Sequence, residues 1–512
     1  MRKFLIAATN SGCGKTTITI GLLRALQRKG LRVQPFKCGP DYIDTQYHRI
    51  AAGVESVNFD TWFAEPAHLR EVFHHYGQEA DVCVVEGVMG AYDGYDRWHG
   101  SSAEIAEILN IPMILIVNAK SMAYSVAPIL YGFKHYEENI RGENIRGERI
   151  VLSASDQEQG IGSGKQEQGI GSSDQDQGTV ASDLAENYSL TSKILTSKIL
   201  NPNLLTSNLL NTHTLSGVIF NNVGSERHAR LLREACEDVG VACFGMIPRL
   251  PNLTIPSRHL GLTLENQQMI ETLVENAADA VSQYVDVEGL SPSSLLQTPS
   301  SYLQTPSSFL PPPSSRLPIS IAHDEAFNFT YRENIDRLRT LGKVTFFSPL
   351  RDKRIPEGTE LLYLPGGYPE FFLKELSANK EMRASVHDYI EKGGKTLAEC
   401  GGMMYLCEQI IDPEGVAFPM CGILKQEATL QDMHLHLGYR EMMLNGQTWR
   451  GHEFHYSEVR GCEGAGARGH ENAKVCDATG RPTETPFYIY KNLRASYLHL
   501  YWGDRNILSL FE

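Results

Sequence analysis

Short runs of apolar residues alternate with longer amphipathic stretches along most of the chain. In the N-terminal part the apolar runs are FLIAAT, LRVQPFK, VCVVEGV, MILIVN and LSGVIFNNV. In the C-terminal part they are LPISIAHD, KVTFFSP, LLYLPGG, KTLAEC and NLRASYLHLYW. This alternation is typical of β-strands that are each followed by a helix. We therefore expect an α/β fold with two doubly wound, mostly parallel sheets, one in each part of the chain.

Two segments interrupt this pattern. The first, at about 137–214, contains tandem copies of ENIRG, QEQGIGS and LTSKI that lie only five to nine residues apart. That spacing is too short for the repeat units that stack into a solenoid. Gln, Gly, Ser and Asn dominate its centre, and such a composition buries too little apolar surface to offset the entropy of ordering. We interpret this segment as a surface loop enlarged by duplication, between MILIVN and LSGVIFNNV.

The second interruption, at about 291–316, repeats LQTPSS and ends in three consecutive prolines. Proline-rich segments are extended and semi-rigid, so we interpret these residues as a linker between domains. The predicted organisation is therefore a first domain at 1–290, which contains the 137–214 insert, and a second domain at 317–512.

Composition narrows the range of partners. The 512 residues include 47 basic and 61 acidic side chains, a net charge of −14, which argues against a general binder of nucleic acid. No run approaches the roughly 20 apolar residues of a membrane helix, and the apolar stretch after Met1-Arg2-Lys3 is too short for a signal peptide. The ten cysteines are sparse and form no Cys-x-x-Cys motif. We expect a reduced, cytoplasmic protein.

A glycine-rich turn follows the first apolar run. The segment ATNSGCGKTT at 8–17 opens the amphipathic stretch ITIGLLRALQRKG, the strand-to-helix setting of a P-loop. There, backbone N–H groups wrap phosphate oxygens, Lys15 neutralises phosphate charge, and the Thr16 hydroxyl reaches Mg²⁺. The strict motif has glycine where this chain has Thr9. We predict an ATP site that includes Gly12, Gly14, Lys15, Thr16 and Thr17.

Acidic residues follow two further apolar runs. Glu86 lies in VCVVEGV, and Asp41 and Asp44 follow LRVQPFK. The carboxyl ends of parallel strands meet at one edge of a sheet, where ligands bind. An aspartate after a strand is often only a turn or helix cap, but three acidic positions near a P-loop favour a metal site. We predict that Thr16, Asp41 and Glu86 hold the metal ion. Lys37 either faces phosphate or is solvated.

The segment KTLAECGGMMYL at 395–406 has the pattern of a strand, a tight turn and a helix. Ala398 and Gly402 flank Cys400 two positions to either side, as in a nucleophile elbow. The following helix N-terminus would favour the thiolate over the thiol. This context predicts that Cys400 is a catalytic nucleophile.

An acyl-transfer cysteine also needs an oxyanion hole and a base. Gly366 and Gly367 follow the apolar run LLYL, and their backbone N–H groups are candidates for the oxyanion hole. His499 lies late in an apolar run, where a histidine is costly unless it is used. His455, in GHEFHYSE, is the competing candidate. We favour His499 as the base.

Together these motifs resemble one family, the cobyrinic acid a,c-diamide synthases of corrinoid biosynthesis. The resemblance covers both globular parts in order and excludes the two interrupting segments. It implies a dethiobiotin-synthetase-like P-loop domain joined to a class I glutamine amidotransferase domain of the flavodoxin-like type. Its most specific segments are FKCGPDYID at 36–44, EGVMGAYDG at 86–94, PGGYPE at 365–370, AECGGMMYL at 398–406, GHEFHYSE at 451–458 and SYLHLYW at 496–502.

The resemblance also implies a reaction. Cys400, assisted by His499, would release ammonia from L-glutamine. ATP with Mg²⁺ would activate a carboxylate of cobyrinic acid as an acyl phosphate, and ammonia would displace the phosphate. Two rounds would give the a- and c-acetamides. Asn221 resembles the adenine-contacting asparagine of related synthetases, and candidates for contact with the substrate are Tyr42 and Asp44, with Arg494 and His452 unranked.

The motifs leave several alternatives open. Typical class I amidotransferases have a glutamate two residues after the base, where this chain has Tyr501, so Glu458 and Asp504 are only guesses for a third triad member. Cobyric acid synthase and nickel-sirohydrochlorin a,c-diamide synthase are the alternatives within the same chemistry, although EGVMGAYDG favours an a,c-enzyme. A partitioning-type ATPase would have lysine at Asn10 and would leave Cys400 unexplained. The metal state of the macrocycle, the order of amidation and a homodimer are left open.

Overall fold

The computed structural model describes residues 2–145, 215–253, 267–290, 317–431, 433–461 and 473–512. Residues 1–131 and 215–512 form one compact unit, and residues 132–214 form a second. Most of the predicted loop at 137–214 and all of the predicted linker at 291–316 lie outside the described residues.

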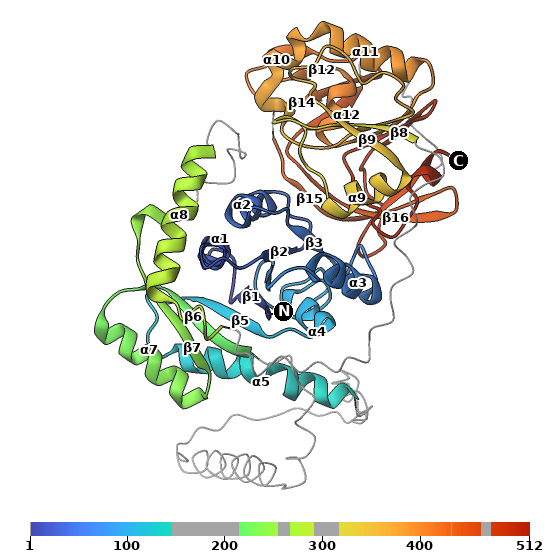
Figure 1. The fold of residues 1–512 in the computed structure, drawn as a ribbon. Coiled ribbons are helices and arrows are strands. Elements are labelled where there is room, and N and C mark those ends of the chain that lie inside the picture. Colours follow the sequence, from blue (N-terminus) through green and yellow to red (C-terminus); the bar gives the residue numbers. More distant parts are fainter. Residues whose placement is uncertain (1, 146–214, 254–266, 291–316, 432, 462–472) are drawn as a thin grey trace, which may run out of the picture. The chain divides into compact units, whose positions relative to one another are not determined.

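A seven-stranded sheet forms the N-terminal half of the larger unit (Figure 1). All of its strand pairs are parallel. β1 lies between β4 and β5, so the chain changes direction across the sheet at β1, the place where open α/β sheets bind ligands. In sheet order the strands are β3 (Val57–Phe59), β2 (Val33–Cys38), β4 (Val82–Glu86), β1 (Arg2–Ala8), β5 (Met113–Asn118), β6 (Leu215–Val223) and β7 (Ala242–Pro248).

Helices cover both faces of this sheet, which explains why its strands are apolar on both sides. α1, α2 and α8 pack together, while α3 packs with α4. One buried cluster joins Phe4 and Ile6 of β1 to Ile20 and Leu23 of α1. The elements are α1 (Lys15–Arg28), α2 (Ile43–Ala52), α3 (Pro66–Gly77), α4 (Ser102–Leu109), α5 (Val126–Ile145), α7 (Glu226–Val239), the 3₁₀ turn η2 (Pro251–Leu253) and α8 (Gln267–Tyr284).

A six-stranded sheet forms the core of the C-terminal half. Its strands are parallel except for the antiparallel edge strand β19. In sheet order they are β19 (Phe487–Tyr490), β20 (Leu493–Ser496), β11 (Lys395–Glu399), β10 (Leu361–Leu364), β8 (Leu317–Ala322) and β9 (Gly342–Phe347). The associated helices are α9 (Arg332–Leu341), η7 (Pro369–Phe372), α10 (Leu373–Ala378), α11 (Lys380–Glu391), α12 (Gly401–Leu406) and η8 (Ile507–Phe511).

Two four-stranded sheets complete this half, and the sequence pattern did not predict them. The first contains β13 (Ala417–Pro419), β12 (Cys407–Ile411), β14 (Leu424–Thr429) and β17 (Glu458–Gly461). The second contains β18 (Lys474–Asp477), β15 (His436–Leu444), β16 (Gln447–His455) and β21 (His499–Tyr501). The parallel α/β architecture predicted for the chain is nevertheless present in both halves.

Two predicted element boundaries are wrong. NLRASYLHLYW does not form one strand, because the chain leaves β20 of the six-stranded sheet after Ser496 and enters β21 of a different sheet at His499. In addition, α5 runs to Ile145, so the first residues of the segment expected to be a loop are helical. Repetition of a short sequence does not by itself prevent a helix.

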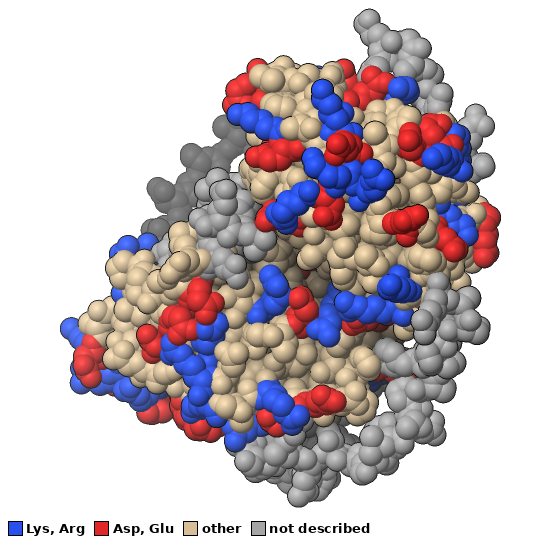
Figure 2. All heavy atoms as spheres, turned by 45° about the horizontal axis from the view of Figure 1, so that its top comes forward, with Lys and Arg blue, Asp and Glu red and all other residues tan. Residues whose placement is uncertain are grey.

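In the part of the chain that the structure describes, no helix combines the length and apolar character needed to cross a membrane. On the face drawn in Figure 2, Lys and Arg side chains are interspersed with Asp and Glu. This face therefore carries no continuous basic surface, as expected for a chain whose net charge is −14.

The contact between α1 and α8 generates a prediction. A Cβ added to Gly21 would lie 2.6 Å from the carbonyl oxygen of Ala277 and 2.8 Å from a methyl carbon of Val281. Gly21→Ala should therefore separate the helices and lower the free energy of unfolding by about 1–3 kcal/mol. We expect this as a lower midpoint of urea denaturation.

The matched control is Gly132→Ala, because a Cβ at this helical glycine would meet nothing within 4 Å. That change should leave stability unaltered or raise it by about 0.5–1 kcal/mol, because alanine favours helix more than glycine does. Equal midpoints for the two variants would contradict the close approach at Gly21.

Candidate functional site

The glycine-rich turn between β1 and α1 has the backbone of a phosphate-binding loop. Gly14 has φ of 91°, in the left-handed region, and a Cβ there would lie 2.2 Å from Nδ2 of Asn221. Both constraints require glycine. The loop thus places the N-terminus of α1, where backbone N–H groups are free to face an anion, beside the carboxyl edge of the sheet.

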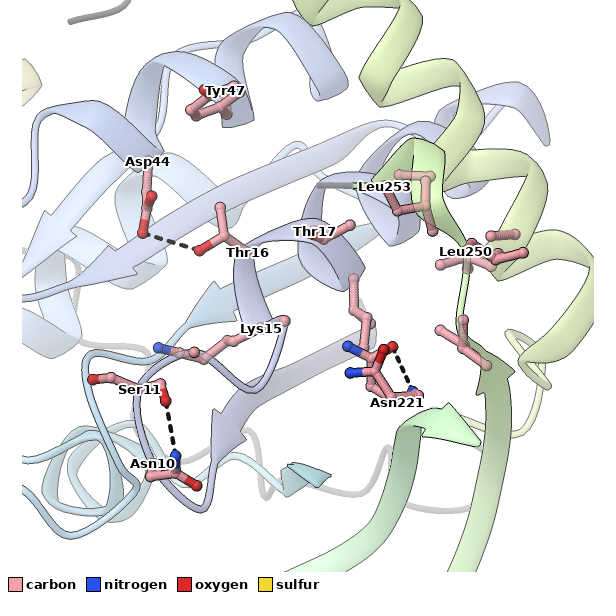
Figure 3. Close-up of a pocket in the computed structure, with 18 of the residues that line it drawn as sticks. Asn10, Ser11, Lys15, Thr16, Thr17, Asp44, Tyr47, Asn221, Leu250 and Leu253 are labelled. Atoms are coloured by element: carbon pink, nitrogen blue, oxygen red, sulfur yellow. Dashed lines mark hydrogen bonds between the residues drawn. The ribbon is translucent and has the colours of Figure 1, made fainter. Parts of the chain in front are cut away.

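A cavity of about 630 Å³ opens beside this turn (Figure 3). Its polar end is formed by the turn itself and by side chains at the sheet edge, while its other end is apolar. A nucleotide has the same division, with charged phosphates and a flat, largely apolar base. The polar end includes Asn10, Ser11, Gly12, Gly14, Lys15, Thr16, Thr17, Lys37, Asp41 and Asp44, and the apolar end includes Ile247, Pro248, Leu250, Leu253, Ala277, Ala280 and Val281.

Asn221 lines this cavity, but its amide is also used to support the turn. Nδ2 donates to the carbonyl oxygen of Cys13 at 2.9 Å, and Oδ1 accepts from the backbone N–H of Asn222 at 2.9 Å. The side chain at the end of β6 therefore fixes the phosphate-binding backbone of a turn that lies some two hundred residues earlier. The apolar lining from β7, η2 and α8 was not predicted from the sequence.

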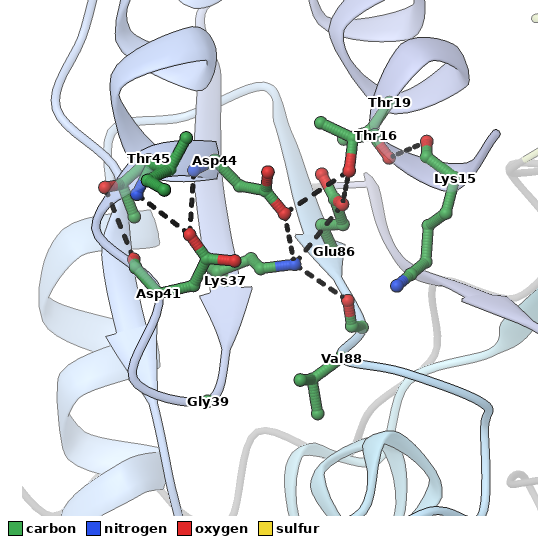
Figure 4. A network of polar contacts seen from close by, with 12 residues as sticks. Lys15, Thr16, Thr19, Lys37, Gly39, Asp41, Asp44, Thr45, Glu86 and Val88 are labelled. Atoms are coloured by element: carbon green, nitrogen blue, oxygen red, sulfur yellow. Dashed lines mark hydrogen bonds and ion pairs between the residues drawn. The ribbon is translucent and has the colours of Figure 1, made fainter. Parts of the chain in front are cut away.

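Two buried carboxylates and one buried ammonium group meet at the carboxyl edge of the sheet (Figure 4). Nζ of Lys37 lies 2.8 Å from Asp44 and 3.3 Å from Glu86, and it also donates to the carbonyl oxygen of Gly87 at 3.0 Å. The hydroxyl of Thr16 donates to Glu86 at 2.7 Å and lies 3.3 Å from Asp44. Lys37 is thus buried and ion-paired, not solvated.

The charges in this group stabilise one another. Burial alone would raise the pKa of Glu86, but the charge of Lys37 and a hydrogen bond from His48 hold it well below its ordinary value. Burial would lower the pKa of Lys37, but Asp44 and Glu86 raise it. Burial lowers the pKa of Lys15, and the nearby charge of Lys37 lowers it further. Glu86 and Lys37 are therefore both charged.

His48 of α2 holds the second oxygen of Glu86, a role that no motif in the sequence indicates. Its Nε2 lies 2.6 Å from Oε2 of Glu86, and its Nδ1 lies 3.1 Å from the hydroxyl of Ser56. The imidazole is completely buried. One Glu86 oxygen is consequently fixed by His48, while the other faces Thr16 and Lys37.

Asp41, which we predicted to be a metal ligand, caps α2 through one of its oxygens. Oδ1 accepts hydrogen bonds from the backbone N–H groups of Ile43 and Asp44, both at 2.8 Å. Asp44, one of the three acidic positions near the turn and a candidate for substrate contact, meets Thr16 and lies across Lys37 from Glu86. Both aspartates line the cavity, but one oxygen of Asp41 is occupied by the backbone N–H groups at the start of α2.

The oxygen donors of this edge fit Mg²⁺ in chemical type. Among the described residues, no group of three or more His, Cys, Asp or Glu side chains is arranged to hold a metal ion by itself. Mg²⁺ is usually held by one or two carboxylates together with nucleotide phosphates and water. Thr16, Glu86 and Asp44 would supply protein oxygens of that kind.

At the other end of the chain, Cys400 occupies a sharp turn between β11 and α12. Its φ and ψ are 45° and −108°, a strained conformation for a residue with a side chain. A Cβ at Gly402 would lie 2.1 Å from the carbonyl oxygen of Leu364, so the turn passes directly over β10. These features agree with the elbow expected from the sequence.

Gly366 separates Cys400 from His499. A Cβ at Gly366 would lie 2.3 Å from Cε1 of His499 and 3.3 Å from Cβ of Cys400, so glycine is required for the two side chains to approach the same backbone. The carbonyl oxygen of Gly366 accepts from the N–H groups of Asn328 and Phe329, at 3.1 and 3.0 Å. This anchoring fixes the Gly366–Gly367 loop beside the sulfur.

Burial, not the helix dipole, dominates the electrostatics of the cysteine. It raises the pKa of the Cys400 thiol, with a further increase from Glu370, and the hydrogen bond from Gly401 N–H only partly opposes this. Our expectation of a thiolate favoured by the helix is therefore wrong for this structure, because α12 is only six residues long and the sulfur is buried. Burial also lowers the pKa of His499, which keeps its imidazole neutral and able to accept a proton.

The competing histidine is already engaged. His455 has Nδ1 2.7 Å from the carbonyl oxygen of Ser457 and Nε2 2.8 Å from Glu453, and its ring stacks on Tyr497. Of the guessed third triad members, Glu458 pairs with Arg460 and Asp504 with Arg505, each at 3.5 Å.

Two further candidates for substrate contact have different surroundings. The guanidinium of Arg494 donates to backbone carbonyls, including that of Leu510 at 2.8 Å, which gives it a structural role. His452 stacks on His499, with ring centroids 4.9 Å apart.

Each half of the chain matches a known protein family. Residues 4–262 match the CobQ/CobB/MinD/ParA nucleotide binding domain, and residues 318–507 match the CobB/CobQ-like glutamine amidotransferase domain. Fold and site therefore define an ATP-using glutamine amidotransferase.

Named relatives make the assignment more specific. The chain is 33% identical to "Cobyrinate a,c-diamide synthase" of Caldanaerobacter subterraneus subsp. tengcongensis, over 98% of this chain and 95% of that protein. It is 31% identical to "Hydrogenobyrinate a,c-diamide synthase" of Brucella anthropi, over 90% of each, and 31% identical to "Cobyrinate a,c-diamide synthase" of Salmonella typhimurium, over 98% and 95%. The chain belongs to the cobyrinate a,c-diamide synthase family.

A buried carboxyl next to the cysteine gives a pH-dependent prediction. Burial raises the pKa of Glu399 to about 8, although Tyr363 and the Leu500 N–H both hydrogen-bond to it. Between its ordinary pKa of 4.5 and about 8, the unfolded chain loses this proton while the folded chain keeps it. Glu399 therefore reduces the free energy of unfolding by roughly 1.4 kcal/mol for each pH unit in that window.

Glu399→Gln removes this titration and keeps the shape. We expect the urea midpoint of the variant to rise relative to the wild type from pH 5 to pH 8, and the difference to level off above pH 8. A difference that stays constant across this range would show that Glu399 does not titrate with a raised pKa.

Proposed function

We propose that the protein amidates the a- and c-acetate carboxylates of cobyrinic acid, with ATP and L-glutamine as co-substrates. The observation that carries this proposal is the match to relatives of that name along nearly the whole chain, which includes both the phosphate-binding turn and the cysteine elbow. Neither site alone would suffice. A carboxylate is a poor acyl donor, and ammonia at neutral pH is mostly ammonium, so activation and sheltered delivery of ammonia are both needed.

In the N-terminal half, the turn and Lys15 would hold the phosphates of ATP, while the apolar end of the cavity would take the base near Asn221. Mg²⁺ held by Thr16, Glu86 and one of Asp41 and Asp44 would neutralise phosphate charge. Asp44 has the more direct contacts with Thr16 and Lys37.

A substrate carboxylate oxygen would then attack the γ-phosphorus, with ADP as the leaving group. This forms an acyl phosphate, whose carbonyl carbon is open to attack by ammonia. The nitrogen loses a proton, inorganic phosphate leaves, and an amide remains. Two such cycles consume two ATP and two glutamine molecules.

In the C-terminal half, Cys400 would attack the side-chain amide of glutamine. His499 would take the thiol proton and pass it to the departing ammonia, and the N–H groups of Gly366 and Gly367 would stabilise the oxyanion. Water would then release glutamate from the thioester. A buried, neutral thiol and a neutral imidazole suit this order of steps, because the thiol proton would move to His499 only when glutamine is in place.

We also propose the domain boundaries 1–290 and 317–512, with Tyr42 and Asp44 near the bound corrinoid. A cytoplasmic setting and a homodimer stay predictions from the sequence.

Replacement of the cysteine separates the two reactions. Cys400→Ser should abolish amidation that depends on glutamine, by at least about 10³-fold, and should leave amidation supported by added ammonium salts. Cys407→Ser is the matched control, since this buried cysteine lies at the start of β12 and its sulfur faces the carbonyl oxygen of Met403. The control should keep both activities.

The measurement is the initial rate of ATP-dependent product formation with each nitrogen source. Loss of both activities in a folded Cys400→Ser protein would refute the two-site scheme.

The product itself tests the substrate. Incubation with cobyrinic acid, glutamine and MgATP, followed by mass spectrometry, should show two carboxyl-to-amide conversions. Cobalt-free hydrogenobyrinic acid should be tested in parallel, because relatives of both names match at similar identity. Four conversions would indicate cobyric acid synthase, and amidation of nickel-sirohydrochlorin alone would indicate the nickel enzyme. No amidation of any corrinoid or nickel tetrapyrrole would refute the proposal.

A further inference from the structure

His499 lacks the polar support that a catalytic histidine normally has. Its side chain is completely buried, and neither Nδ1 nor Nε2 has a hydrogen-bond partner among the described residues. In a catalytic triad, a carboxylate bonded to the second ring nitrogen fixes the orientation of the imidazole. Here the residue two positions later is Tyr501, whose hydroxyl donates to Glu333.

Aromatic rings contact His499 instead. His452 stacks on it at a centroid distance of 4.9 Å and an angle of 18°, while Tyr42 lies at 5.2 Å and Phe329 at 6.2 Å, both tilted by about 50°. Gly366 lies against Cε1. The imidazole is therefore held by shape and ring contact.

One of these rings comes from the N-terminal half of the compact unit. Tyr42 lies in the loop between β2 and α2, is only 7% exposed, and stacks on Phe329 with centroids 5.0 Å apart at 11°. Nε2 of Gln46, one helical turn further on, lies 3.4 Å from Oδ1 of Asn328. The loop is thus held against the segment that precedes α9.

We propose that Tyr42 is a positioning residue for the glutaminase, because its ring completes the contacts that keep His499 aligned with Cys400. This inference rests on the glutaminase roles proposed above for those two residues. Without the ring, a gap opens beside an imidazole that no hydrogen bond restrains. A misplacement of about 1 Å at a reacting group costs on the order of 100-fold in rate.

The test follows the sulfur itself. A diazoketone analogue of glutamine alkylates the nucleophilic cysteine of glutaminases, with loss of nitrogen gas, and intact-mass spectrometry measures the rate. Full-length wild type is compared with Tyr42→Phe, which keeps the ring, and with Tyr42→Ala and Tyr42→Leu, which remove it. Tyr42→Leu retains apolar volume, so it replaces Tyr42→Ala in the comparison if the alanine variant folds poorly.

The matched control is Tyr76→Ala. Tyr76 of α3 also joins the two halves, through a 2.8 Å hydrogen bond to Asp336 of α9, but it does not contact His499. Cys400→Ser establishes that alkylation reports on Cys400.

We expect alkylation at pH 7.5 to be at least about tenfold slower in Tyr42→Ala and Tyr42→Leu, and within about twofold of wild type in Tyr42→Phe and Tyr76→Ala. The pH profile adds a readout that a purely structural role would not move. Without aligned help from His499, alkylation should follow ionisation of a thiol whose pKa is raised by burial, and so rise steeply toward pH 9.5. In the wild type the profile should be flatter.

Equal rates and profiles for Tyr42→Leu and wild type would overturn the proposal, as would equal slowing in Tyr76→Ala. If the wild type were not alkylated at Cys400 at all, the glutaminase roles themselves would fail, and the inference with them. The two failures are therefore distinguishable.

Discussion

The ion pairing of Lys37 with Asp44 and Glu86 is the constraint on which the N-terminal site depends. Two carboxylates buried without a cation would cost several kcal/mol each, so their placement at the sheet edge requires the ammonium between them. That one group joins β2, β4 and α2, and through Thr16 it reaches the start of α1. The phosphate-binding turn is consequently supported by the same charges that are available to a metal ion.

The cysteine site differs from the N-terminal site, because its buried groups are neutral and not charged. Burial there favours neutral groups, which raises the pKa of Cys400 and lowers that of His499. In the glutaminase role that we propose for this pair, neutral groups would react only once a substrate changed their surroundings, which would limit wasteful hydrolysis of glutamine. Strain at Cys400 and the required glycine at 366 show that steric fit, more than charge, brings the side chains of Cys400 and His499 against the same glycine.

The sequence predicted the features that depend on short segments. The phosphate-binding turn and the cysteine elbow each occupy about ten consecutive residues. Gly14 and Gly402 are glycines because a Cβ at either position would clash with a neighbouring group. Features that depend on distant contacts were missed. The division of 492–502 into two strands, for example, depends on which sheets β20 and β21 join. Lys37 and His48 both contact Glu86, which lies about forty to fifty residues away in the sequence.

The segment that runs from the end of β2 into the first turn of α2 has Asp44 facing the phosphate-binding side and Tyr42 facing His499, two residues apart. Separate subunits that shared such a segment would have to associate before the imidazole was held, and each association would cost translational and rotational entropy. In a single polypeptide that cost is largely removed, because a tethered partner has a high effective concentration. Fusion of the two halves is thus more than an economy of gene expression. It keeps the two sites in a fixed one-to-one ratio, whatever the protein concentration.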